Sequence, residues 1–257
     1  AICCNSLSRC YTSLPFDREK FELNVAAATE YAARDVELSE ADGNLYPAQL
    51  GSARAQLASC LRKGGDIVQA FELYKVAIEG LNVGGDLSAE LMTRLELTEM
   101  LLCEGRGAEV PDFTSEAYKQ GAKALEVSER LNDKGNALNA LEMMSRSGKG
   151  NKEDSEKLEA SLREARGGKL DKVCVLCDKA LDWGVVDADA DDKVFTAVKM
   201  CMHSYHRGCI AAWVGQDNLR CPVHGCEKGA DMRKHVKSDP GVLLRLAKGE
   251  HDMINCF

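Results

Sequence analysis

The sequence predicts a mainly helical fold that is followed by a small α+β module near the C-terminal end. Aromatic residues make up only 5% of the 257 residues and prolines number five, while Ala, Leu, Glu and Lys are plentiful, a composition that favours helices over a β-sandwich or barrel. Apolar residues recur at helical spacing along most of residues 19–166. Beyond them, six of the twelve cysteines and three of the five histidines lie between Cys174 and Cys226. Such a local concentration is typical of a metal site.

The first forty residues are expected to form an arm and then a helix. Residues 1–18 are predicted to be an N-terminal arm. Their first ten residues, AICCNSLSRC, lack the positive region and the long apolar core of a signal peptide. Its neighbouring cysteines, Cys3 and Cys4, are either acylated or two free thiols in a disordered segment. Residues 19–41 carry apolar side chains at helical spacing before the break DGNLYP, which predicts a helix.

The stretch RAQLASCLRKGGDIVQAFELYKVAIEG, residues 54–80, predicts two helices joined at Gly64 and Gly65. Its side chains resemble the pattern of a tetratricopeptide repeat, in which Leu and a small residue precede a Gly, an Ala, an aromatic residue and a second Ala. The matching positions are Leu57, Ala58, Gly65, Ala70, Tyr74 and Ala77. Arg54 stands where such repeats usually have tryptophan, and no proline closes the repeat.

Two further hairpins are expected to follow. The second begins at Glu90, and its first helix has Leu97, Leu101 and Gly105 in register with the first hairpin. After a longer loop a second helix resumes, with small residues at Ala117 and Ala124. The third runs through residues 136–148 and 155–168, where the register is largely lost. Residues 19–166 are therefore predicted to be a repeat-like helical domain, with a plain helical bundle as the alternative.

Stacked hairpins leave a groove, which is more often a binding surface than a catalytic one. In repeats of this kind the first helix of each hairpin lines the groove, which here places Ser52, Ser59, Arg62 and Lys63 along it. We expect the groove to bind a protein substrate or adaptor, with the positive Arg62–Lys63 pair facing an acidic or C-terminal segment. The alternative for this pair is a solvated helix end.

Cysteines and histidines follow one another closely in CMHSYHRGCIAAW, residues 201–213. Together with VCVLC upstream and CPVHGC downstream, the order is C-x-x-C, 23 residues, C-x-H-x-x-H-x-x-C, 11 residues, then C-P-x-H and a further Cys. Eight side chains at this spacing are enough for two tetrahedral zinc ions. They are Cys174, Cys177, Cys201, His203, His206, Cys209, Cys221 and His224, with Cys226 as the alternative eighth ligand.

This order resembles the RING-H2 finger, and the predicted module covers residues 167–228. The resemblance implies a cross-braced fold with interleaved ligands. One zinc ion would take Cys174, Cys177, His206 and Cys209, and the other Cys201, His203, Cys221 and His224 or Cys226. Closed sites of this kind are structural, so no catalytic residue is expected. A nucleophilic Cys–His pair within residues 201–209 is the alternative.

The 23-residue segment between the second and third ligands contains DADADD, residues 187–192. This acidic run lacks the Gly and the Glu that a calcium-binding EF-hand loop has at its sixth and twelfth positions, so a solvated hairpin tip is expected. KVFTAVKM, residues 193–200, is then the returning strand, because its residues favour β structure.

Resemblance to RING-H2 fingers implies a ubiquitin ligase, which docks a ubiquitin-conjugating enzyme beside its substrate and works by proximity. The resemblance places the docking surface at Val175, Trp213 and Pro222. Such fingers commonly have a basic residue after the eighth ligand, where this chain has Gly225, or Glu227 if Cys226 is the ligand. A scaffold without enzymatic activity, in a larger protein assembly, is therefore the alternative.

Several classes of partner are not expected. The net charge of −8 argues against nucleic acid, because affinity for a duplex rests largely on Lys and Arg at the phosphates. No run of about 18 apolar residues is present, so no membrane span is predicted. The clustered cysteines indicate a reducing compartment, the cytoplasm or the nucleus. Residues 229–257 are predicted to be a C-terminal extension.

Overall fold

The structure is a computed structural model, and it describes residues 2–13, 20–41, 46–105, 108, 110–168, 171–183, 194–196, 202–216, 218, 220–223 and 226. Helices account for most of these residues, as the sequence predicts. The chain divides into two compact units, Ala1–Met100 with Gly107–Val110 and Leu101–Arg106 with Pro111–Phe257. The boundary expected at residue 167 thus lies inside the second unit.

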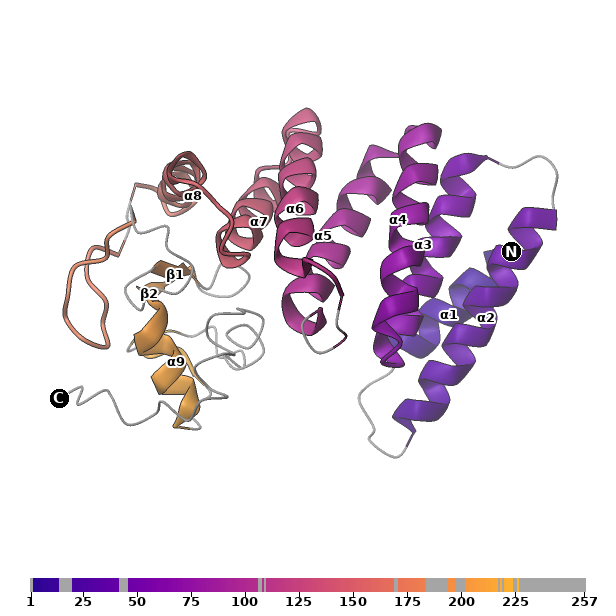
Figure 1. The fold of residues 1–257 in the computed structure, drawn as a ribbon, viewed down its shortest axis with the longest axis horizontal. Coiled ribbons are helices and arrows are strands. Elements are labelled where there is room, and N and C mark those ends of the chain that lie inside the picture. Colours follow the sequence, from indigo (N-terminus) through magenta and orange to yellow (C-terminus); the bar gives the residue numbers. More distant parts are fainter. Residues whose placement is uncertain are drawn as a thin grey trace. The chain divides into compact units, whose positions relative to one another are not determined.

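In the first unit each helix packs against the next one along the chain: α1 (Ile2–Ser13), α2 (Phe21–Ala41), α3 (Pro47–Lys63) and α4 (Ile67–Gly84). The α3–α4 pair has the most extensive contacts, and Figure 1 shows the two helices side by side. The next helix, α5 (Leu87–Glu104), begins in this unit and ends in the other.

The α3–α4 hairpin forms as predicted from its small residues and glycines. Gly65 adopts a positive φ of 88° at the turn, and the Asp66 side chain then caps α4 by accepting a hydrogen bond from the Gln69 backbone N–H. The helices approach so closely that a Cβ at Gly84 would overlap the backbone of Ala48. The matched alanines and Tyr74 are fully buried, so this pattern specifies packing between helices: Ala58, Ala70, Tyr74 and Ala77.

Helix α1 corrects the expectation of a disordered N-terminal arm for residues 2–13. This helix packs on α2 and α3, and its contact with α2 includes a stacked pair of rings, Tyr11 and Tyr31, with centroids 5.9 Å apart. A further buried contact joins Ser8 Oγ and Cys60 Sγ at 3.3 Å. Helices of this length gain most of their stability from tertiary packing. That contribution is not visible in the local sequence.

The second unit continues with α6 (Phe113–Arg130), α7 (Lys134–Arg146) and α8 (Lys152–Ala165), in which α6 packs on α7 and α7 on α8. Helix α8 begins with a capping box formed by Asn151 and Asp154. The expected third hairpin is therefore present as the packed pair α7 and α8, and the segments of the expected second hairpin are the helices α5 and α6. This helical architecture is consistent with a repeat.

The described residues of the second unit that follow α8 form a small module. It contains β1 (Val194–Thr196) and β2 (Ser204–His206), which pair antiparallel with Val194 opposite His206, followed by α9 (Arg207–Gly215). Strand β1 lies within the predicted returning segment. The module contacts the helices through Trp183 and Met202, which pack on apolar residues of α7 and α8: Leu138, Leu141, Leu158 and Leu162.

Candidate metal centres

The first predicted ligand pair lies in a tight turn. The Cys174 carbonyl accepts hydrogen bonds from the backbone N–H groups of Cys177 (3.2 Å) and Asp178 (2.8 Å), which bends the chain back on itself. Asp178 has a positive φ of 56°, and a bridge between Val173 and Ala180 closes the turn. Cys174 is fully buried and Cys177 is half-buried.

The third predicted ligand pair, His206 and Cys209, lies at the junction of β2 and α9. His206 is the last residue of β2 and Cys209 lies in the first turn of α9. The strand and helix bring the pair to the turn, so the potential ligand atoms of Cys174, Cys177, His206 and Cys209 all lie within 4.8 Å of one another. This group can hold a metal ion.

The orientation of the His206 ring suits a metal ligand. Its Nε2 lies 2.9 Å from the Ala180 carbonyl, so this nitrogen carries the proton and donates it. The other nitrogen, Nδ1, is the one that faces the cysteines, and it lies 3.3 Å from the Cys177 sulfur. Metal-bound histidines commonly donate their second ring N–H to such an acceptor, which fixes the tautomer and raises the basicity of the ligand nitrogen.

Close packing of the sulfur atoms shifts the pKa values of two thiols in opposite directions. The hydrogen bond from Cys209 lowers the pKa of the Cys174 thiol to about 5, against the effect of burial, and the backbone N–H groups of His206 and Leu176 assist. The same hydrogen bond, together with burial, raises the pKa of the Cys209 thiol. A second thiolate here therefore needs a compensating positive charge, which a bound cation supplies.

A second group contains His203, Cys221 and Cys226, whose potential ligand atoms also lie within 4.8 Å of one another. The Cys221 sulfur is 3.4 Å from His203 Nδ1 and 2.9 Å from the hydroxyl of the fully buried Tyr205. Burial lowers the pKa of His203, which favours the neutral imidazole that a metal requires.

Two predicted ligands of this second group, Cys201 and His224, lie outside the described residues. The structure thus places the alternative eighth ligand, Cys226, beside His203 and Cys221. The eighth ligand preferred from the sequence is His224. Nothing in the sequence indicates that Tyr205 contacts a ligand, because a tyrosine between two histidines can point its side chain toward the metal group or away from it.

The two groups alternate along the chain: the first and third ligand pairs form one, and the second and fourth segments contribute to the other. Ligands of both groups, Cys209 and Cys221 among them, pack against one small apolar core of Cys174, Leu181, Tyr205, Ile210, Ala211 and Val214. Four donors fill a tetrahedral shell, so the first centre has no open position for a substrate and suits a structural role.

The residues expected to dock a partner lie around this core. Val175 is exposed to 48% in the turn between the first two cysteines. Trp213 of α9 packs against the core with its ring and donates its Nε1 hydrogen bond to the Arg220 carbonyl at 3.0 Å. Pro222 is half-buried and directly follows Cys221.

The groove residues predicted in the first unit are in part engaged by the chain itself. Burial raises the pKa of Glu96, while the Tyr74 hydroxyl, 3.2 Å from its carboxylate, and the charges of Arg62 and Lys63 oppose that rise. Ser59 forms a hydrogen bond with Tyr74. The positive pair therefore lies near a carboxylate of this chain, which weakens the reason for expecting an acidic partner there.

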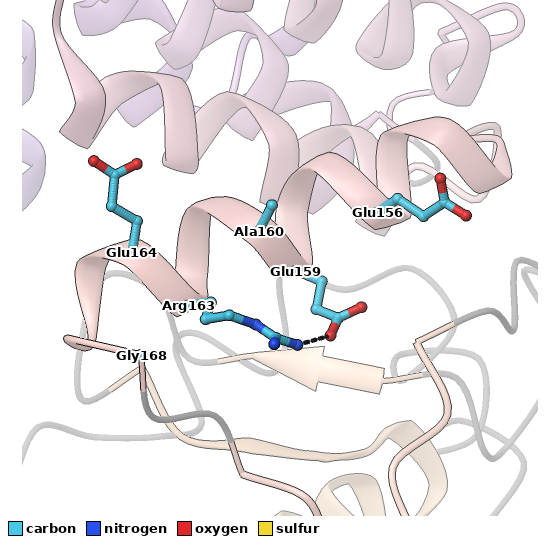
Figure 2. Close-up of a pocket in the computed structure, with 6 residues that line it drawn as sticks. All are labelled: Glu156, Glu159, Ala160, Arg163, Glu164 and Gly168. Carbon is cyan, nitrogen blue, oxygen red and sulfur yellow. Dashed lines mark hydrogen bonds and ion pairs between the residues drawn. The ribbon is translucent and has the colours of Figure 1, made fainter.

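A hollow of about 420 Å³ lies on α8, away from both metal groups. Figure 2 shows Glu159 and Arg163 joined by an ion pair on one side of the helix. Its other carboxylates, Glu156 and Glu164, have partners in Lys152 (3.8 Å) and Lys134 (2.6 Å). Charges that are paired at the surface in this way do not define a binding site.

The sequence matches no protein-family model and no curated protein. Each helix in the described part of the chain is too short or too polar to cross a bilayer. What the protein does is therefore inferred from the chemistry and geometry of its own residues.

Proposed function

We propose that the protein is a RING-type ubiquitin ligase, whose C-terminal module binds two zinc ions and docks a ubiquitin-conjugating enzyme, and whose tetratricopeptide-like helices bind a substrate or adaptor. The observation that carries this proposal is the alternation of two Cys/His groups around one small core. Interleaved sites tie distant segments together without a large hydrophobic core, as in the RING-H2 fingers that the ligand order resembles.

The donor set and its spacing suit zinc. Thiolate and imidazole ligands favour zinc over the hard cations calcium and magnesium. In a tetrahedral zinc site, a sulfur at 2.3 Å and a nitrogen at 2.0–2.1 Å from the ion lie about 3.5 Å apart. The Cys177–His206 and Cys221–His203 separations of 3.3 and 3.4 Å are close to this value. When bound, zinc would supply folding free energy, and Cys226 would serve as the eighth ligand.

The ligase activity would lie in orientation. A conjugating enzyme held on Val175, Trp213 and Pro222 would present its ubiquitin thioester beside a substrate on the helices, and no residue of this chain would take part in bond making. The exposed Val175 and the partly exposed indole of Trp213 are the apolar anchors that such an interface needs.

A scaffold without ligase activity is the second candidate. One observation favours it: with Cys226 as the last ligand, the next residue is the acidic Glu227, where RING fingers commonly have a basic residue. In this case the zinc module would only join the protein to a larger assembly.

Purified full-length protein, tested for ubiquitin transfer with a panel of conjugating enzymes, separates the two candidates. We expect transfer by the unaltered chain and its loss in Val175→Arg, because the new charge would be buried unpaired against the partner. Trp213→Ala should weaken docking by about 2 kcal/mol, or about 30-fold. Both variants should retain two zinc ions. Val83→Arg, a matched change at a valine exposed to 77% in α4, should be fully active.

The absence of transfer from the unaltered chain with every conjugating enzyme would favour the scaffold. Unchanged transfer in both docking variants would place the contact surface elsewhere.

A further inference from the structure

Arg166, at the C-terminal end of α8, joins the helical hairpin to the loop that carries the second metal centre. Its guanidinium donates two hydrogen bonds to the Asp171 carboxylate, at 2.9 and 3.0 Å, in a bidentate ion pair. The Nη1 group also donates to the Met202 carbonyl at 3.2 Å. The Arg166 side chain is only 18% exposed, so this contact is more favourable than an ion pair at an open surface.

Asp171 completes the connection from the other side. Its Oδ2 accepts a hydrogen bond of 2.8 Å from the backbone N–H of Ser204. Burial alone would raise the pKa of Asp171, but the hydrogen bonds from Arg166 and Ser204 outweigh it and lower the pKa. Arg166 and Asp171 therefore hold the backbone on both sides of His203, a ligand of the second centre.

Met202 supplies an apolar anchor for the same loop. Its backbone has a positive φ of 55°, a conformation that non-glycine residues hold only where their surroundings fix it. Its side chain packs, together with Trp183, on the leucines of α7 and α8. The hairpin thus fixes both the position and the unusual backbone conformation of the residue that precedes His203.

The first centre has anchors of its own. His206 is held by the Ala180 carbonyl, and the Cys174 turn is closed by backbone hydrogen bonds from Cys174 N–H to Lys179 and from Leu181 N–H to Lys172. None of these contacts involves Arg166. The two centres therefore differ in how much they depend on the helices.

We infer that Arg166 and Asp171 are positioning residues of the second metal centre, and that the α7–α8 hairpin and the metal at that centre stabilise each other. This inference rests on the metal-binding part of the proposed function. The helical part is then more than a tethered substrate-binding domain, because its last hairpin is a structural component of the zinc module.

The test measures zinc affinity of the full-length protein by competition with a chromophoric chelator, which resolves the two ions. Arg166→Met keeps the aliphatic stem and removes the hydrogen bonds, and Asp171→Asn is a milder change of the partner. Each should lower the affinity for one of the two ions by about 10- to 100-fold and leave the other unchanged. The matched control is Arg163→Met, which removes a more exposed ion pair with Glu159 on the same helix.

A second readout follows the coupling in the opposite direction. Removal of zinc from the unaltered chain should accelerate amide hydrogen exchange in α7 and α8 and leave exchange in α3 and α4 unchanged. This measurement needs no variant, so it decides the question even where Arg166→Met fails to fold.

Three results would overturn the inference alone. The first is two zinc ions bound with unaltered affinity in both variants, and the second is no change in α7 and α8 exchange when zinc is removed. Equal weakening of both ions would also overturn it, since it would indicate general destabilisation. Fewer than two zinc ions in the unaltered chain would overturn the metal-binding proposal itself, and the inference with it.

Discussion

Tyr205→Phe is expected to weaken zinc binding at the second centre selectively. The Tyr205 side chain is fully buried, and its hydroxyl lies 2.9 Å from the Cys221 sulfur. The substitution keeps the ring in the core and removes only this oxygen. In the variant, the zinc-bound Cys221 thiolate loses a hydrogen-bond donor. Donors of this kind around metal ligands stabilise the charged sulfur.

The size of the effect follows from the charge on the sulfur. A hydrogen bond to a charged group contributes about 1.5–3 kcal/mol, and one to a neutral group contributes about 1 kcal/mol. A cysteine with its ordinary pKa is a neutral thiol at pH 7 and becomes a thiolate when it binds zinc, so the difference is about 0.5–2 kcal/mol. At about 1.4 kcal/mol per factor of ten, the zinc affinity of this centre should fall about tenfold.

Chelator competition on the full-length protein measures this change, and Tyr118→Phe is the matched control. Its hydroxyl also donates a short hydrogen bond, 2.9 Å to the Asp154 carboxylate at the start of α8. The control should lower helical stability without changing either zinc affinity. Unaltered affinity in Tyr205→Phe, or an equal loss at both centres, would show that the hydroxyl does not support the Cys221 thiolate.

Two further predictions concern the eighth ligand and the helix packing. Cys226→Ala should leave one tightly bound zinc ion, whereas His224→Ala should leave two, because Cys226 is the residue placed beside the other ligands; the reverse pattern in metal analysis would make His224 the ligand. Gly84→Ala should destabilise the protein by about 1–3 kcal/mol in thermal or urea unfolding, since its Cβ would overlap the backbone of Ala48. Gly135→Ala, in α7, would place its Cβ in ordinary van der Waals contact with the Asp133 carboxylate at 3.5 Å and should instead stabilise by up to about 1 kcal/mol. Equal effects of the two alanines would contradict the close approach of α3 and α4.

Local signals were sufficient for the helical hairpins. In α3 and α4 the small residues and the glycine turn specify where the two helices meet and which face is buried, so Ala58, Gly65 and Ala77 could be placed from the sequence. The outer ends, Pro47 and Gly84, lie beyond the predicted residues 54–80. Helix α1 was missed because its stability comes from contacts such as Tyr11 with Tyr31, twenty positions apart.

The candidate metal residues could be found for a similar reason, since the spacing of Cys and His is itself the constraint on a small loop. The supporting contacts could not. Arg166 reaches a carbonyl 36 positions away, and Tyr205 reaches a sulfur 16 positions away. Such contacts depend on the tertiary fold, and an arginine or a tyrosine can form them from many positions in a sequence.

Direct measurement of the zinc content of the full-length protein, combined with X-ray absorption at the zinc edge, tests the central claim. We expect two zinc ions per chain, each coordinated by sulfur and nitrogen atoms in a tetrahedral shell. We also expect the folded C-terminal module to be lost on chelation. One ion or none, or a shell dominated by oxygen, would contradict it.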